Sequence, residues 1–230
     1  MTMSIISLDA VKDHLPIAAP AEYPKPMSAE GYTPSHTGFH VVFSSTANGS
    51  ESFSSKLVAD RAFAPGERVA LLDNKSLAPI KAYSSVQFGN GPNDHLELNS
   101  DLLFMNHSCD PSTEMYLYPG APGRWEVVAG PRGLSAGQDM TFFYPSTEWD
   151  MAQGFDCSCG AKTCLGHVYG AAHLTLEELE ARGLVNEHIR AAKAAQAATI
   201  RANKAKASVA NGVNGVNGVV NVNGEANGVH

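Results

Sequence analysis

The four cysteines of this chain fall within 56 residues of one another. Cys109 lies in the segment Asn106–Pro111, and a C-x-C-x4-C run follows that consists of Cys157, Cys159 and Cys164. Four thiolates complete the tetrahedron of a structural zinc ion. The spacing therefore predicts one zinc site that uses every cysteine, and the alternative is four reduced thiols without metal.

Two histidines near these cysteines, His107 and His167, offer nitrogen ligands. A four-thiolate site does not need them, and it leaves no coordination position for water. The predicted zinc is therefore structural and not catalytic. It requires the fold to bring Cys109 to the three later cysteines, so that the metal holds a C-terminal flap against the Asn106–Pro111 segment.

The composition is that of a globular protein of 230 residues, 43% apolar and 17% charged, and we expect one compact domain. No apolar run approaches the ~20 residues of a membrane span. Residues 1–20 lack the basic start and long apolar stretch of a secretory signal. We therefore expect an intracellular protein with no membrane contact. Lys204–Lys206 is too weakly basic to predict a nuclear signal, so nucleus and cytoplasm are not distinguished.

The charge of the chain is unevenly distributed. Its net charge is −7, but residues 185–230 hold five basic and two acidic residues, which leaves 11 basic and 21 acidic residues, a net charge of −10, in the first 184. An acidic body disfavours direct nucleic-acid binding and suits a basic protein tail or a neutral small molecule. Simple solubility is the alternative interpretation. The sequence predicts no particular oligomeric state.

Short β-favouring runs dominate residues 37–150, and turn residues such as Pro65 and Gly66 separate them. Helical periodicity is nearly absent in this region, and the Pro-rich residues 1–36 predict an irregular arm. Strands are predicted at Phe39–Phe43, Lys56–Phe63, Val69–Leu72, Ser84–Phe88, His95–Leu98, Met115–Tyr118, Trp125–Ala129 and Met140–Tyr144.

Helices are expected in residues 171–208, after the predicted zinc segment at 151–170. Thr175 and Glu178 have the spacing of a capping box for a first helix, and Gly183 is its expected end. A second, Ala-rich helix is predicted from about Asn186 to Ala207 and is marginal or partner-dependent, because it has little to bury. The Asn-Gly-Val repeats of residues 209–230 predict a disordered tail.

Three motifs together resemble those of SET-domain methyltransferases with a post-SET zinc segment. They are Asn106–Pro111, the string Gly137–Tyr144 that ends in Thr-Phe-Phe-Tyr, and Cys157–Gly160 with Cys164–Gly166. Upstream, Leu57–Val69 is similar to the first strand pair of the family. The resemblance covers residues 53–170, which makes residues 37–150 the expected SET domain.

The resemblance implies a mainly β fold of small curved sheets, with the Asn-His-Ser-Cys segment passing through a loop as a pseudoknot. It implies S-adenosylmethionine as cofactor, in contact with Asn106, His107 and Tyr144. Leu165 would lie against the adenine side. Tyr144 would be the tyrosine of the catalytic centre, and Phe142 the aromatic residue that limits the number of methyl groups. The zinc ligands would be the four cysteines.

The chemistry of methyl transfer fits these residue types. Transfer from a sulfonium is an in-line displacement, so the catalyst must align and desolvate a neutral nucleophile. A tyrosine hydroxyl stays neutral at pH 7 and can orient an incoming amine. Asparagine supplies donors and an acceptor for a zwitterionic amino-acid group. An ordinary strand aromatic is the alternative interpretation of Tyr144.

The chain departs from the family pattern at two places. Ser54–Lys56 stands where the family has Gly-x-Gly, and Lys56 is expected to meet the cofactor carboxylate. Phe143 replaces a frequent aspartate near the substrate. Trp149 would form a wall of the pocket or only pack at a hinge.

Three hypotheses follow for the function. The first is N-methylation of a protein lysine. The second is an enzyme of the same fold that acts on a small molecule such as a secondary metabolite, which the missing carboxylate at Phe143 favours. The third is a non-catalytic binding module, which the altered Gly-x-Gly position favours.

Overall fold

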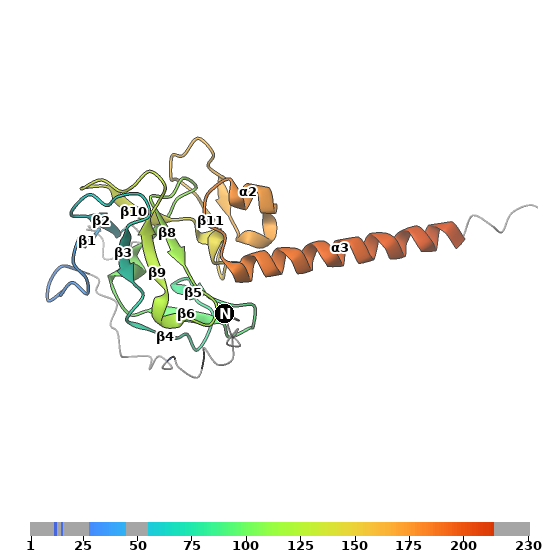
Figure 1. Cartoon of the computed structure of the whole chain (residues 1–230), viewed down its shortest axis with the longest axis horizontal. Coiled ribbons are helices and arrows are strands. Elements are labelled where there is room, and N and C mark those ends of the chain that lie inside the picture. The colour runs from blue at the N-terminus through green and yellow to red at the C-terminus, as the bar shows by residue number, and fades with distance from the viewer. Residues whose placement is uncertain (1–11, 13–14, 16–27, 45–54, 214–230) are drawn as a thin grey trace, which may run out of the picture. The chain divides into compact units, whose positions relative to one another are not determined.

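The computed structural model describes residues 12, 15, 28–44 and 55–213 (Figure 1). The chain forms two compact units, one up to Lys193 and one from Ala194 on. The described part of the second unit is helical, and most of the predicted disordered tail, residues 214–230, lies outside the described residues. In the described part of the chain no helix has the length and apolar character needed to cross a bilayer. The finer domain boundaries stay predictions.

The first unit is mainly β, as expected (Figure 1). One small sheet carries the Asn-His motif. In this sheet β10 runs antiparallel to β2 and parallel to β7, with Thr141 opposite Asn106 and Phe142 opposite His107. Two motifs 35 residues apart along the chain thus become neighbours. The sheet order is β1 (Phe39–Val42), β2 (Lys56–Ala59), β10 (Asp139–Phe142) and β7 (Asn106–His107).

The other described strands form three further small sheets, because Gly, Pro, Asn and Asp interrupt every apolar run. Gly66 and Gly137, for example, adopt φ values of 73° and 79° in turns, which glycine tolerates best. The sheets are β3 (Arg68–Leu71), β9 (Glu126–Ala129) and β8 (Thr113–Tyr116); β4 (Lys75–Leu77), β6 (His95–Leu98) and β5 (Ser85–Gln87); and β11 (Phe155–Asp156) with β12 (His167–Val168).

Two apolar clusters form the core, and β10 separates them. Phe142 belongs to the larger cluster, which includes the fully buried Leu57 and Met140. The next residue, Phe143, faces the opposite way into the smaller cluster. The rest of that cluster comes from later in the chain: Ala171, Leu179, Val185 and Ile189, with Trp149, Leu165 and Leu174 packed against it.

Some predicted boundaries are wrong. The strand Met140–Tyr144 ends at Phe142, because Pro145 has no N–H to donate and Tyr144 begins a 3₁₀ turn. The strand predicted to Phe63 ends at Ala59. The 3₁₀ turns are η1 (Asp101–Phe104), η2 (Pro122–Arg124), η3 (Tyr144–Ser146) and η4 (Ala171–His173).

The helices follow the local signals at their starts. The capping box at Thr175 opens α2 (Leu176–Glu180), and Gly183 follows with φ 114°. Helix α3 (Glu187–Val213) runs past the predicted end at Ala207 by six residues, among which only Ala210 is a strong helix former, so local propensity does not explain the extension. The tail predicted from residue 209 therefore begins as helix.

Asn186, just before α3, joins three elements through its buried side chain. Its Oδ1 accepts a hydrogen bond from Leu117 N at 2.9 Å, and its Nδ2 donates to Met115 O at 2.9 Å and to Ser146 O at 3.0 Å. The side chain is 4% exposed. The start of α3 is thereby tied to the end of β8 and to the turn that follows Tyr144.

Asn186→Ala should lower the free energy of unfolding by about 1–3 kcal/mol, because it leaves buried backbone groups without partners. Denaturant titration measures the change. Asn90→Ala is the matched control, since the Asn90 amide donates to His188 O from an exposed position and its loss should stay within about 0.5 kcal/mol. Equal losses for the two variants would contradict the role given to Asn186.

Candidate active site and metal centre

The strand pair β10–β7 places Tyr144 against the Asn-His motif. Ser108 N donates to Phe142 O at 3.1 Å and extends the ladder beyond His107. One turn later, the Tyr144 hydroxyl donates to Met105 O at 3.0 Å, and the Tyr144 N–H donates to His107 Nδ1 at 3.2 Å. The backbone and the side chain of Tyr144 are therefore both bound to the motif.

Aromatic rings surround the Tyr144 phenol. Its ring centroid lies 4.7 Å from that of Phe142, 5.2 Å from that of His107 and 6.0 Å from that of Phe155. Burial raises the pKa of Tyr144, and the charge of Glu148 raises it further. The phenol is neutral at physiological pH and acts as a hydrogen-bonding group, not as a base.

His107 connects Tyr144 to the cysteines. Because its Nδ1 accepts the Tyr144 N–H, its proton resides on Nε2, which lies 3.3 Å from Cys109 Sγ and can donate to the sulfur. Burial lowers the pKa of His107 to about 4, and the positive charge of Arg182 contributes, so the imidazole is neutral. Contact between His107 and a cofactor stays a prediction.

The four cysteines converge, as the spacing predicted. The Sγ atoms of Cys109, Cys157, Cys159 and Cys164 all lie within 4.8 Å of one another. Four sulfurs at ~2.3 Å from a zinc ion would lie ~3.8 Å apart, so a small contraction around an ion completes a tetrahedron. The donor set therefore fits structural zinc, which these four residues would hold.

Backbone donors at the sulfurs would stabilise thiolates, whereas burial opposes the ionisation of two of the thiols. Leu165 N donates to Cys109 Sγ at 3.4 Å, and Gly166 N donates to Cys164 Sγ at the same distance. Burial raises the pKa of the Cys109 and Cys157 thiols, so these two keep their protons at pH 7 unless a cation replaces them. Metal binding should therefore release protons.

The cysteine-bearing flap, residues 155–168, folds over the tyrosine. Its two strands β11 and β12 pair with Phe155 opposite Val168, and Cys157 N donates to Gly166 O at 2.7 Å. The Phe155 ring then lies 5.6 Å from that of His107. Arg182 holds the flap from outside through a hydrogen bond to Thr163 O at 2.8 Å.

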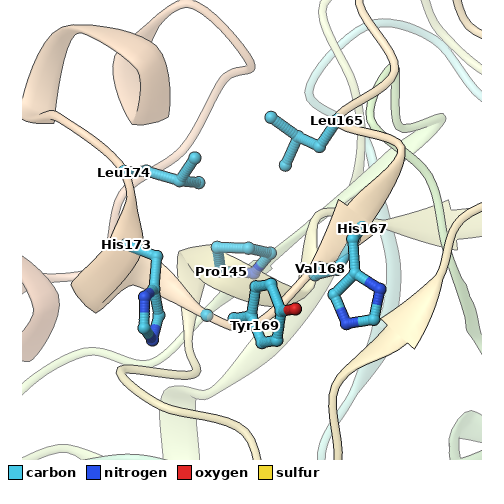
Figure 2. Close-up of a pocket in the computed structure, with 8 residues that line it drawn as sticks. Pro145, Leu165, His167, Val168, Tyr169, His173 and Leu174 are labelled. Atoms are coloured by element: carbon cyan, nitrogen blue, oxygen red, sulfur yellow. The ribbon is translucent and has the colours of Figure 1, made fainter.

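A pocket of about 130 Å³ opens beside the flap (Figure 2). Leu165 and Leu174 form one side, and a row of three rings, His167, Tyr169 and His173, forms the other. The centroids of neighbouring rings in this row are 4.0 and 5.3 Å apart. Pro145, the residue after Tyr144, lies at the base. The pocket therefore adjoins the candidate tyrosine through Pro145.

Other predicted site residues have partners of their own. The Lys56 ammonium pairs with both oxygens of Asp139, at 2.7 and 2.9 Å. Asn106 Nδ2 donates to Ser55 O at 3.0 Å, which places the motif beside the altered Gly-x-Gly position. Ser54 lies outside the described residues, and the cofactor roles of Lys56, Asn106 and Leu165 stay predictions.

Two aromatic residues take packing positions. Phe143 is 3% exposed in the smaller cluster, where the Arg182 guanidinium lies 5.8 Å from its ring centroid. Trp149 packs against the same cluster, and its backbone N–H donates to Gln87 Oε1. Among the residues that sequence reasoning did not assign to the site, Phe155, Arg182, Gln87 and Glu148 all contact it. No local signal marks them, because each depends on segments distant in sequence.

Comparisons with known proteins agree with the methyltransferase resemblance. The chain is 46% identical over 114 residues to the methyltransferase flvH of Aspergillus flavus, covering 49% of this chain and 60% of that protein. It is 29% identical over 77 residues to the histone-lysine N-methyltransferase ash1 of Drosophila melanogaster, a match that covers 34% of this chain and 4% of that protein. It is 28% identical over 110 residues to the histone-lysine N-methyltransferase ASHH3 of Arabidopsis thaliana, a match that covers 40% of this chain and 30% of that protein.

The chain thus spans less than two thirds of each of these curated relatives. No family model matches it. All three relatives are named as methyltransferases, and two of them as histone-lysine enzymes, which supports a SET-like methyltransferase.

Purified protein should carry one zinc ion per chain, and removing it with a chelator should release the flap. Elemental analysis gives the metal content, and limited proteolysis within residues 155–168 reports release of the flap. Cys159→Ser should show both effects without chelator, because it removes one of four ligands. Ser158→Ala, a change in the same loop that leaves the sulfurs intact, should show neither. Full zinc content in Cys159→Ser would refute the assignment.

Proposed function

We propose that this chain is an S-adenosylmethionine-dependent methyltransferase of the SET class that methylates a protein lysine side chain. The observation that carries the proposal is the partly buried Tyr144 phenol, which is joined to the Asn106–His107 strand beneath a flap whose three cysteines cluster with Cys109. The similarity to named methyltransferases supports the same assignment.

S-adenosylmethionine, when bound, supplies a methyl group on a positively charged sulfur. The residues of this chain would exclude water and align the lysine amine. Tyr144 is fixed by its bond to Met105 O, so its phenol oxygen can accept a hydrogen bond from the amine. Phe142 would restrict the space beside the nitrogen, since its ring touches that of Tyr144. Neither residue needs to change its protonation state.

The cofactor would be held between the motif and the flap. Asn106 has an amide oxygen and a second N–H for the amino-acid end, and the pocket at Leu165 would receive the adenine ring. The His107 ring would hold Tyr144 and Cys109 in place at this site through its hydrogen bonds to both residues. Lys56 would have to exchange its bond with Asp139 for one with a cofactor carboxylate.

The names of two relatives favour a protein lysine as the acceptor. The net charge of −10 in the first 184 residues also suits a basic protein segment. Methylation of a low-mass amine is the competing result that the same assay would reveal.

Zinc-loaded full-length protein should bind S-adenosylhomocysteine in calorimetry and should transfer labelled methyl groups to lysine-containing peptides on an array. Low-mass amines are assayed in parallel. Absence of binding by the zinc-loaded protein would contradict the proposal, and labelling of amines alone would overturn its protein substrate.

Tyr144→Phe should reduce kcat by roughly 10²-fold, because the phenyl ring keeps its packing but loses the hydroxyl that orients the amine. Binding of S-adenosylhomocysteine should change little. Tyr118→Phe is the control, since its hydroxyl donates to Glu126 in another sheet. Unchanged kcat in Tyr144→Phe would remove this residue from the catalytic centre.

A further inference from the structure

The segment after β10 forms a tight turn whose hydrogen bonds converge on the Tyr144 carbonyl. Tyr144 O accepts the N–H of Thr147 at 3.0 Å and that of Glu148 at 2.9 Å. The direction in which the Tyr144 side chain leaves the backbone therefore depends on the two residues that close this turn.

The carboxyl group of Glu148 anchors the turn to a different sheet. Glu148 is 8% exposed, and its Oε1 accepts the Gln87 N–H of β5 at 2.7 Å. The Gln87 side chain in turn accepts the N–H of Trp149 at 2.9 Å. Strand β5 thus holds the turn by two hydrogen bonds, one to a side chain and one to the backbone.

The Thr147 hydroxyl lies midway between this carboxyl group and the Tyr144 carbonyl. Its Oγ1 is 3.2 Å from Glu148 Oε1 and 3.2 Å from Tyr144 O. A hydroxyl has one proton and can donate to only one of them. If Glu148 is ionised, the proton of Thr147 is drawn to the carboxylate. If Glu148 is protonated, it can donate to Thr147 Oγ1, which then donates to Tyr144 O.

We propose that Glu148 is a positioning residue for Tyr144, and that the Thr147 hydroxyl transmits the protonation state of its carboxyl group to the Tyr144 backbone. The inference rests on the proposed function only insofar as Tyr144 is a catalytic residue. The hydrogen-bond chain itself is a property of the fold and can be tested without a methyl acceptor.

The surroundings make Glu148 the group that changes charge near neutral pH. Burial raises its pKa to about 7, against the opposing effects of the Gln87 and Thr147 hydrogen bonds and of the Lys81 charge. His188 donates from Nε2 to Thr147 O, and burial lowers its pKa to about 4. Further titratable groups face His188 from β6 and the residue before it: His95, opposite Gln87, whose pKa burial lowers, and Asp94.

The raised pKa of Glu148 determines how the stability of the fold changes with pH. The folded protein holds the Glu148 proton more tightly than the unfolded chain does, so its stabilising effect is fully present below the ordinary pKa of 4.5 and is lost as the pH rises to about 7. Glu148→Gln removes this dependence. The melting temperature of Glu148→Gln should therefore rise relative to that of the unmodified protein between pH 5 and pH 8.

The direct test follows the Tyr144 ring by NMR in full-length, zinc-loaded protein with ¹³C-labelled tyrosine, with the signal assigned by its absence in Tyr144→Phe. In the unmodified protein the Tyr144 signal should move with pH, with a midpoint near 7. Glu148→Gln should abolish the movement. Thr147→Val should reduce it, because valine keeps the shape but cannot transmit the proton, and Thr147→Ser should restore it. Glu126→Gln is the control and should titrate as the unmodified protein does.

A Tyr144 signal that does not move with pH, or that moves equally in Glu148→Gln, would overturn the inference. Movement that persists fully in Thr147→Val would show a direct charge effect and would refute the hydroxyl relay. If methyl transfer is also measured, kcat should lose an inflection near pH 7 in Glu148→Gln, while KM for S-adenosylmethionine stays unchanged. A protein that shows the NMR titration but binds no cofactor would refute the proposed function alone.

Discussion

The convergence of four thiol groups is the interaction on which the rest of the site depends. Cys109 belongs to the same segment as Asn106 and His107, whereas its three partners lie on the flap. Four sulfurs within 4.8 Å are poorly compatible with four charges unless a cation neutralises them. Ordering the flap backbone costs roughly 1–2 kcal/mol per residue, and the roughly 10–16 kcal/mol released at structural zinc sites offsets a large part of that cost. Metal binding and closure of the flap would then be one event.

The closed flap explains the aromatic surroundings of the Tyr144 phenol. Phe155 comes with the flap and covers His107 and Tyr144, while Phe142 packs on the phenol from the larger core cluster. Phe143, the residue after β10, lies in the smaller cluster, where Leu165 of the flap packs against it. The Tyr144 phenol is thereby partly shielded from water, which under the proposed function would help to align a neutral amine.

Sequence reasoning succeeded where chemistry restricts residue types or where the signal is local. The cysteine set was predictable because thiolates are the ligands that zinc selects, and the α2 start because a capping box spans only Thr175–Glu178. The parallel pairing of Asn106 with Thr141 and the chain Glu148–Thr147–Tyr144 were not predicted, since both arise from contacts between distant segments. Lys56 illustrates the same limit, because its partner Asp139 comes from a neighbouring strand.

X-ray absorption spectroscopy at the zinc edge of the purified protein reads the shared metal site itself. We expect one zinc ion with four sulfur neighbours at ~2.3 Å and no nitrogen or oxygen ligand. A spectrum that requires histidine nitrogen, or fewer than four sulfurs, would contradict a zinc site shared by the four cysteines. It would also contradict the metal link between the flap and the Asn-His segment.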